Sequence, residues 1–398
     1  MLTLQLALLC LATPIYQPLI EGRVLFETPS GEIHEQRLAD FEATTLNQLG
    51  AAWVRFTDAR PQVATDPRNT VELELHTGDR LRGRVFNGDE EGIVLELAGG
   101  VRFPLPIDGI RSLIFPARLP ADGTALLSSA GEGDRLYRLV GDNLDRIDGA
   151  VESFSASGVQ FESVLGTRKF NWDEVGALFI EAFEDEAPST TGKGESVVCD
   201  LVDGSRLRGQ LLLLDRRGCL LQIAGEHELL LPIAVLSEIS LDDGSVAFLS
   251  DLTASSIEEG SPFGDDLGMV WPHRMDRSVM GTALIAGGET YSRGIGVHAP
   301  SSLSFDLDEK WNQLRGLIAI DDAVLRLHAR GSVIFRIKVD GEIAYASGVV
   351  RGGTPPIAFP PVDLTGAKLL TIECDVATDF AVADRANWLR MVLVRTEQ

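Results

Sequence analysis

The sequence predicts an all-β protein built mainly from short strands. Its 398 residues include 40 glycines and 18 prolines, which favour frequent turns over long helices. Segments such as Val71 to Leu75 alternate apolar and polar residues, as a strand with one buried face does. A short sequence pattern also recurs along the chain. The length allows about two to four domains, and a hydrophobic content of 44% predicts packed domains.

The N-terminal residues predict export. Met1 to Ala12 are almost wholly apolar, a run that is too short to span a bilayer but fits the central region of a signal peptide. We therefore expect residues 1–17 to be a signal peptide, although no Lys or Arg precedes the apolar run. The alternative is a buried N-terminal strand. Later segments do not reach transmembrane length, so we expect no membrane span.

The next segment, residues 22–69, is less regular. Arg23 to Glu27 fit a strand, and Leu38 to Leu49 have a weakly helical pattern. One interpretation is a degenerate first copy of the repeated unit, but the segment does not align with the other copies.

The repeat is clearest between two seven-residue segments. Thr77 to Gly83 reads TGDRLRG, and Asp203 to Gly209, 126 positions later, reads DGSRLRG. The same shift places Gly92 on Gly218. Each segment predicts a strand, a tight turn at Asp or Gly, and a second strand, and the later glycine is expected to form a further turn.

A third copy lies between these two and is more divergent. Gly149 and Gly158 keep the nine-residue spacing of the glycines in the other copies, while Trp172 and Asp173 replace a Pro-Ile pair. A unit of about 45 residues with four or five strands resembles the Sm-like small β-barrels in fold plan only. We expect three such units, at residues 70–117, 134–182 and 195–243.

These units are expected to act as a scaffold or spacer, with exposed edges that could bind a protein partner. The segments that connect them, from Arg118 to Asp134 and from Glu184 to Ser196, read as polar linkers. His76 and His227 lie in strand-like stretches and are interpreted as packed or solvated side chains.

Charge and cysteine content restrict the partners. The formal net charge of −24 argues against nucleic acid and anionic lipid, because both require a positive protein surface. The cysteines lack the spacing of a zinc site. Cys199 and Cys219 lie in the same repeat and could meet across a sheet, either as a disulfide or as two buried thiols.

The C-terminal block, residues 246–398, carries two distinctive segments. Tyr291 to Pro300 reads YSRGIGVHAP, and Asp384 to Trp388 reads DRANW. With the strand-like stretches between them, these segments resemble the NPCBM family. The resemblance implies a galactose-binding-like β-sandwich (a jelly roll) that binds carbohydrate. Arg385 stands where the family usually has histidine, and the loop from Cys374 to Phe380 lacks the family's Gly-Asp-Gly.

Sugar recognition needs an aromatic face for the C–H side of the ring and polar groups for the hydroxyls. Trp271 and Trp388 are the candidate stacking residues. The candidate polar partners are His298, Asp384, Arg385 and Asn387. Two alternatives remain open: Trp388 could fill the core of the sandwich, and His298 could be a buried histidine bonded to the backbone.

A calcium ion is a further possibility. Asp321, Asp322 and Asp340 offer oxygen ligands, which calcium prefers, and galactose-binding-like sandwiches often hold a structural calcium. Acidic residues are abundant in this chain, however, so a chance cluster is the alternative.

The sequence therefore predicts a non-catalytic, exported protein in which barrel-like repeats present a C-terminal module that binds a glycan or polysaccharide. The alternative is a structural or assembly protein that uses the sandwich and the barrels for protein contacts. Hydrolase motifs such as Gly-x-Ser-x-Gly and His-Glu-x-x-His do not occur, and we expect no enzyme activity.

Overall fold

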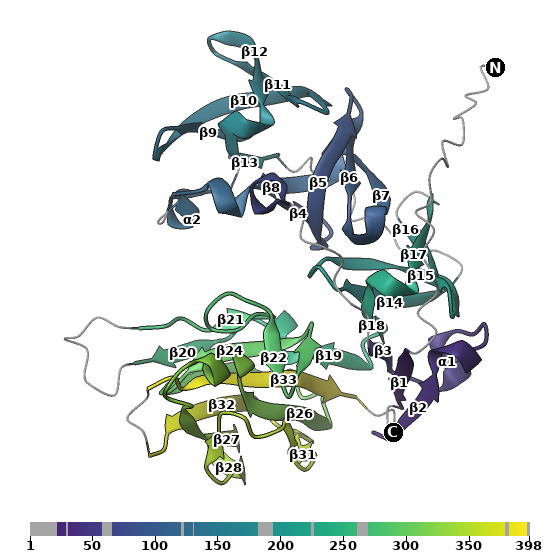
Figure 1. Ribbon diagram of the computed structural model, residues 1–398, viewed down its shortest axis with the longest axis vertical. Helices are drawn as coiled ribbons and strands as arrows, with labels where there is room; N and C mark the ends of the chain where they lie inside the picture. Colours follow the sequence, from purple (N-terminus) through teal and green to yellow (C-terminus); the bar gives the residue numbers. More distant parts are fainter. Residues whose placement is uncertain are drawn as a thin grey trace. The chain divides into compact units, whose positions relative to one another are not determined.

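The computed structural model is almost entirely β and divides into two compact units (Figure 1). It describes residues 22–28, 31–57, 66–120, 123–129, 131–181, 194–223, 227–260, 270–378 and 382–395. Unit 1 comprises residues up to Ile239 apart from Glu27–Glu32, and unit 2 comprises Glu27–Glu32 and Ser240–Gln398. The expected signal peptide lies outside the described residues. The helices within those residues are all too short or too polar to cross a membrane.

Unit 1 contains three copies of a five-stranded antiparallel element, which we call repeats 1, 2 and 3. In each, the first strand pairs with the second and the fifth, the second pairs with the third, and the third pairs with the fourth. This pairing curls the strands into a small barrel. Repeat 1 consists of β4(Val71–Leu75), β5(Arg80–Gly88), β6(Gly92–Glu96), β7(Arg102–Pro106) and β8(Ile110–Ile114).

Repeats 2 and 3 have the same order, with a 3-10 turn before each fifth strand. Repeat 2 is β9(Asp134–Val140), β10(Asn143–Ser155), β11(Gly158–Ser163), β12(Gly166–Asn171) and β13(Val175–Phe179). Repeat 3 is β14(Glu195–Leu201), β15(Arg206–Asp215), β16(Gly218–Ile223), β17(His227–Pro232) and β18(Leu236–Leu241). The 3-10 turns are η4(Ile107–Gly109), η6(Trp172–Glu174) and η8(Ile233–Val235).

A β-bulge at the same place in each second strand supports this alignment. The pairing register shifts between Val85 and Asn87 in repeat 1, 66 positions later in repeat 2, and 126 positions later in repeat 3. A bulge bends a strand, so the second strand can pair with the first strand at one end and with the third at the other. The predicted fold class, with barrel-like units ahead of a sandwich, is therefore confirmed.

The glycine that recurs at the start of the third strand of each repeat does not form the turn that we expected. Gly92, Gly158 and Gly218 each begin a third strand. A Cβ atom on any of the three would lie 2.0 Å from a carbonyl oxygen of the fourth strand, that of Leu105, Phe170 and Leu231 respectively. Close approach of two backbones, and not a turn, excludes a side chain here. The predicted tight turns do occur, at Gly78 and Gly204 with φ of 84° and 88°.

The N-terminal segment keeps part of the same plan. It contains β1(Arg23–Glu27), β2(Ile33–Arg37), η1(Leu38–Asp40), α1(Leu46–Leu49) and β3(Trp53–Thr57). β1 pairs with β2 and β3, as a first strand pairs with a second and a fifth. The short helices η1 and α1 occupy the place of the third and fourth strands. This loss explains why the segment does not align with the repeats.

The elements of unit 1 join in two ways. Fifth strands pair with each other: β8 pairs with β13, and β18 pairs with β3. Repeats 1 and 3 instead meet through their second strands, β5 and β15. The other short helices in the described residues of unit 1 are η2(Pro67–Asn69), η3(Ala98–Gly100), η5(Pro116–Arg118) and α2(Gly123–Leu126).

Cys199 and Cys219 lie in the core of repeat 3 as free thiols. Their sulfur atoms are 4.0 Å apart, and both side chains are fully buried. Burial raises the pKa of the Cys199 thiol, so this group stays protonated at neutral pH. Of the two alternatives left open by the sequence, the structure has the pair of buried thiols.

Unit 2 is a β-sandwich of two antiparallel sheets, which we call the sandwich domain. The first sheet contains β21(Arg274–Met275), β24(Gly294–His298), β33(Arg385–Val394), β26(Gln313–Ile320) and β30(Ile357–Ala358), with β19(Val246–Phe248) and β31(Val362–Asp363). The second contains β20(Ser256–Glu259), β25(Ser301–Asp306), β32(Leu369–Val376), β27(Ser332–Val339), β28(Glu342–Ala346) and β29(Val350–Arg351). The described part of the domain also contains a hairpin, β22(Leu284–Ala286) and β23(Glu289–Tyr291), and two 3-10 turns, η9(Leu249–Asp251) and η11(Asp322–Arg326).

Apolar side chains from both sheets fill the space between them. Trp388, Phe335 and Phe305 are fully buried there, with a shell of aliphatic residues. Burial of side chains this large supplies most of the stabilisation of such a core. This packing fixes the last residue of β24, His298, and the first residue of β33, Arg385, which pair at one end of the first sheet.

Candidate functional site

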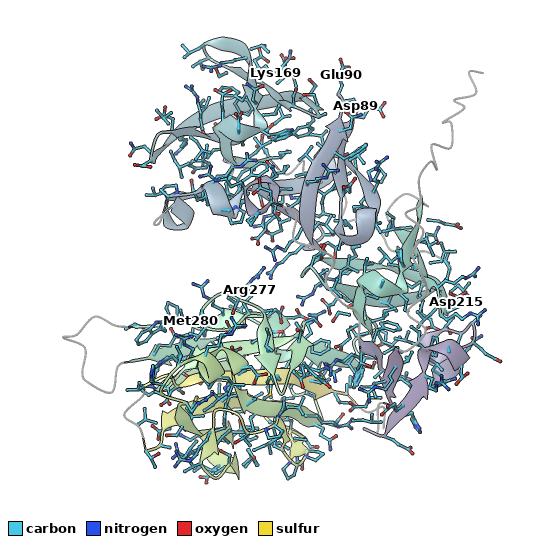
Figure 2. The ribbon with its side chains drawn as sticks, viewed as in Figure 1. Asp89, Glu90, Lys169, Asp215, Arg277 and Met280 are labelled. Carbon is cyan, nitrogen blue, oxygen red and sulfur yellow. The ribbon has the colours of Figure 1, made fainter. Side chains whose placement is uncertain are left out.

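A cluster of aromatic and charged side chains lies at one end of the sandwich domain. His298 ends β24, and Arg385 begins β33 directly opposite it in the antiparallel register. Trp271 and His273 precede β21, while Glu259 ends β20 of the second sheet. Both sheets therefore contribute to the cluster. Met280 lies in the loop after β21 (Figure 2). It is 46% exposed.

Trp271 stacks on His298. The ring centroids lie 4.4 Å apart with an interplanar angle of 22°. His298 is 9% exposed, whereas Trp271 is only half-buried. The imidazole thus supports one side of the indole and leaves part of the aromatic surface open to solvent. An indole held in this way can accept the apolar face of a ligand ring.

The imidazole of His298 is neutral at pH 7. Its Nδ1 donates a hydrogen bond to the carbonyl oxygen of Ala299 at 2.9 Å, which leaves Nε2 as an acceptor. Burial lowers the pKa of His298, and the Arg385 charge lowers it further, although the bond to Ala299 opposes both. A neutral ring can stack on Trp271 without bringing a second positive charge close to Arg385.

Arg385 supplies hydrogen-bond donors beside the stacked pair. Its side chain is half-buried, and its guanidinium makes no hydrogen bond or ion pair within the described residues. A guanidinium offers five N–H donors in one plane, which suits the hydroxyl groups of a sugar.

Glu259 and His273 fix the loop that carries Trp271. The Nδ1 atom of His273 lies 2.9 Å from a carboxylate oxygen of Glu259, and the His273 backbone N–H donates to the same oxygen at 2.5 Å. This pair ties the loop before β21 to the end of β20. The sequence does not mark Glu259 or His273 as site residues, because a contact between residues 14 positions apart leaves no local pattern.

Three of the expected ligand contacts are wrong. Asp384, Asn387 and Trp388 are all 0% exposed, so their side chains do not reach a ligand at the surface. β33 pairs with both β24 and β26, and it is covered on its two faces. Trp388 packs edge-on against Phe335, with centroids 4.8 Å apart, and belongs to the core, which is the alternative that the sequence left open for it.

The two buried polar residues have structural partners. Asp384 accepts a hydrogen bond from the Ser332 backbone N–H at 2.7 Å, and Asn387 donates to Asp321 at 2.8 Å. They hold β33 to the neighbouring elements and thereby position Arg385. Trp271, His298 and Arg385 are the predicted site residues that the structure brings together.

The expected calcium ligands do not converge. Asp321 accepts from the Ala323 backbone N–H at 2.9 Å. Asp322 accepts from two glycine N–H groups of the β22–β23 turn, and Asp340 accepts from two N–H groups just before and in β32. Among the described residues, no group of three or more acidic, histidine or cysteine side chains could hold a metal ion. These carboxylates stabilise turns instead.

Comparisons with known proteins support the family resemblance. Residues 245–394 match the model of the NPCBM/NEW2 domain, which confirms the resemblance predicted for the C-terminal block. A stretch of 119 residues, 29% of this chain, is 35% identical to alpha-1,3-galactosidase B from Akkermansia muciniphila. The chain spans only 14% of the length of that relative.

Two solved structures are also similar. One is the CBM51 of a Clostridium perfringens GH95 in complex with methyl-galactose, with 21% identity and a TM-score of 0.33, covering 37% of this chain and 99% of that one. The other contains the tandem CBM51 modules of a family 98 glycoside hydrolase from Streptococcus pneumoniae. It has 12% identity and a TM-score of 0.32, and the match covers 89% of this chain and 100% of that one.

Proposed function

We propose that this protein is an exported, non-catalytic carbohydrate-binding protein in which the barrel-like repeats carry the sandwich domain. The observation that supports it best is the half-exposed indole of Trp271, stacked on a neutral His298 beside Arg385. The match of this domain to the NPCBM/NEW2 model agrees with glycan binding.

In this proposal the apolar face of a pyranose packs on the open side of Trp271. Arg385 donates hydrogen bonds to the ring hydroxyls, and Nε2 of His298 accepts one. The Glu259–His273 pair keeps the Trp271 loop in place, so little side-chain freedom is lost on binding.

Galactose-terminated glycans are the first ligand class to test. The relative from Akkermansia muciniphila, which is 35% identical over 119 residues, is named as an alpha-1,3-galactosidase. The proposed ligand is therefore a glycan with terminal galactose or a derivative of galactose.

The test compares the full chain with Trp271→Ala on an array of galactose-terminated and glucose-terminated glycans. We expect selective retention by the wild-type protein and a loss of about tenfold or more in the variant, a factor that corresponds to about 1.4 kcal/mol. Tyr345→Ala is the matched control, because Tyr345 is a half-buried aromatic residue on β28 at an edge of the second sheet. Unchanged retention by folded Trp271→Ala protein would refute the stacking role.

A further inference from the structure

Repeats 1 and 3 form a local two-fold joint inside the chain. Arg80 of β5 pairs with Arg206 of β15, and these are the same position of the repeat, 126 residues apart. The Arg82 N–H donates to the Ser205 hydroxyl at 2.8 Å, and the equivalent N–H of Arg208 donates to Asp79 at 3.1 Å. Each repeat thus gives and accepts the same bond, as in a symmetric dimer interface.

The loop between the third and fourth strands also takes part in this joint. In repeat 1 this loop contains η3, and its Ala98 N–H donates to Asp203 of repeat 3 at 3.1 Å. Leu97 at the start of the loop is only 4% exposed. The joint therefore has two parts, a second-strand edge and an apolar loop beside it.

Repeat 2 has the same second-strand edge without a partner in unit 1. Residues 143–149 of β10 pair with β9 and residues 149–155 pair with β11, so the other side of residues 143–148 remains open within the described part of this unit. The shared bulge places Asp145 at the position of Asp79 and Ser205. It also places Asp148 at the position of Arg82 and Arg208. An acceptor side chain is thus kept at one position in all three repeats, and that of Asp145 is exposed.

The equivalent loop of repeat 2 exposes its apolar side chains. It is a two-residue turn between β11 and β12, in which Val164 is 100% exposed and Leu165 is 95% exposed. Lys169 lies on β12 of the same hairpin (Figure 2). Two adjacent aliphatic side chains in full contact with water are unfavourable unless a partner covers them.

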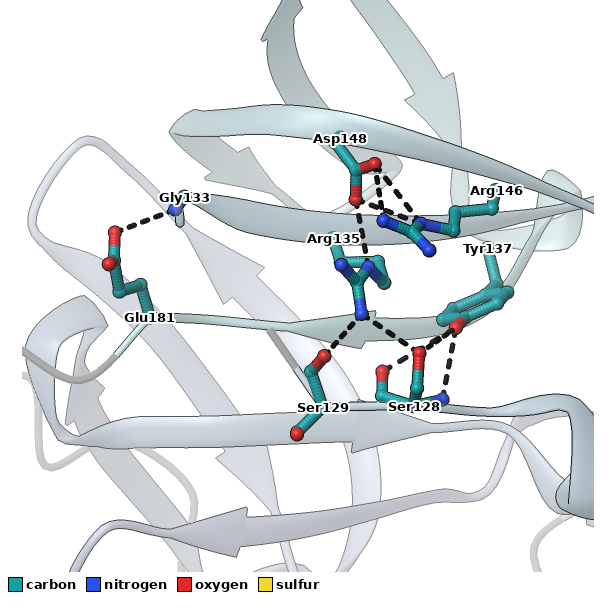
Figure 3. Close-up of polar contacts among 8 residues, drawn as sticks. All are labelled: Ser128, Ser129, Gly133, Arg135, Tyr137, Arg146, Asp148 and Glu181. Atoms are coloured by element: carbon teal, nitrogen blue, oxygen red, sulfur yellow. Dashed lines mark hydrogen bonds and ion pairs between the residues drawn. The ribbon is translucent and has the colours of Figure 1, made fainter. Parts of the chain in front are cut away.

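Charge does not oppose association at this edge. Between residues 135 and 148 there are three arginines and three aspartates, although the whole chain has a net charge of −24. Asp148 accepts hydrogen bonds from Arg146 and Arg135, each at 2.8 Å (Figure 3). These bonds lower the pKa of Asp148 to about 2, so its carboxylate is ionised at neutral pH and offsets the charge of the neighbouring arginines.

We propose that a second copy of this chain docks on repeat 2, and that the two β10 edges pair antiparallel about Arg146. The N–H of Asp148 then donates to Asp145 of the other copy and the reverse bond also forms, as in the joint between repeats 1 and 3. Val164 and Leu165 are buried against the opposing repeat. A second copy fits best because the edge contains both the donor, the Asp148 N–H, and the acceptor, the Asp145 side chain. The chain also joins two of its own repeats, 1 and 3, in this way.

The first test is the mass of the full chain by analytical ultracentrifugation over a range of concentrations. We expect a dimer with a concentration-dependent monomer fraction. The double variant Val164→Asp with Leu165→Asp should raise the dissociation constant at least tenfold, since it places charges in the interface. Leu230→Asp is the control, because Leu230 is 59% exposed on β17 of repeat 3. A wild-type protein that is monomeric throughout would overturn the proposal.

The second test examines the register. In the proposed pairing the two Arg146 positions face each other across the two-fold axis, at a Cα separation that a disulfide can bridge. Arg146→Cys should therefore give a covalent dimer on mild oxidation. Arg217→Cys, an exposed position in the β15–β16 turn, should not. A dimer that Arg146→Cys does not link, and that the double Asp variant leaves intact, would show that a different surface is used.

Discussion

At the scale of single residues, the protonation state of His298 matters most to the candidate site. The ring is nearly buried beneath Trp271 and faces the positive charge of Arg385. Both surroundings favour the neutral form and lower the pKa of His298. The stacked pair should consequently be most stable at neutral pH and weaken in acid.

We predict that acidification destabilises the sandwich domain through His298. The pKa is lower in the folded than in the unfolded protein, so the unfolded chain binds the proton more readily. The stability contribution is fully present above the ordinary histidine pKa of about 6.5 and is lost as the pH falls through the lowered folded value. Thermal unfolding between pH 7.5 and pH 5 should show a larger loss in the wild-type protein than in His298→Gln. Equal losses in the two proteins would contradict this prediction.

The sequence named part of the candidate site because some of its residues lie in recognisable segments. Trp271, His298 and Arg385 were all identified, and the structure brings them together. Asn387 is buried, and for Trp388 the structure has the core position that the sequence left open as the alternative. The sequence could not decide this, because it does not show that β33 pairs on both sides and is covered on both faces. Which strands are central depends on long-range pairing, and this also hid the contact between Glu259 and His273.

At the scale of elements, the repeats were predictable from their glycines, although for the wrong reason. Their spacing predicts turns. Gly92 and its equivalents are required because the third and fourth strands approach too closely for a Cβ atom. The N-terminal segment shows the limit of such reasoning, since it keeps the first, second and fifth strands but lacks the glycine-bearing pair that made the other copies recognisable.

We predict that Gly92→Ala destabilises repeat 1 by about 1–3 kcal/mol, the usual cost of forcing extra atoms into a packed site. Gly109→Ala is the matched control in the same repeat, because its Cβ would meet only Pro106 at an ordinary 3.5 Å. Hydrogen exchange of peptides from β4 to β8, measured by mass spectrometry, reports the local effect. Faster exchange in both variants alike would show that the facing carbonyl is not the cause.

At the scale of the whole molecule, the barrel-like repeats form an ordered series. The N-terminal segment joins repeat 3 and repeat 2 joins repeat 1 through fifth strands, while repeats 1 and 3 join through second strands. The two kinds of joint alternate, and the open second-strand edge of repeat 2 is where the next joint of the series would form. The proposed dimer continues this alternation across a symmetry axis.

The dimer and the proposed glycan site together predict avidity. A dimer carries two sandwich domains, and a surface rich in glycans can engage both, which typically strengthens binding by about 100-fold or more without a new contact. The double variant Val164→Asp with Leu165→Asp should therefore dissociate much faster than the wild-type protein from a densely coated glycan surface. Its affinity for a soluble monovalent sugar should be unchanged, because Trp271, His298 and Arg385 lie in the other compact unit.

Surface plasmon resonance at high and low glycan density, with calorimetry for the soluble sugar, separates the two effects. Loss of both affinities would show that the substitutions disturb the sandwich domain, whereas equal retention of the two proteins at high density would mean that the two sites of a dimer do not bind one surface together.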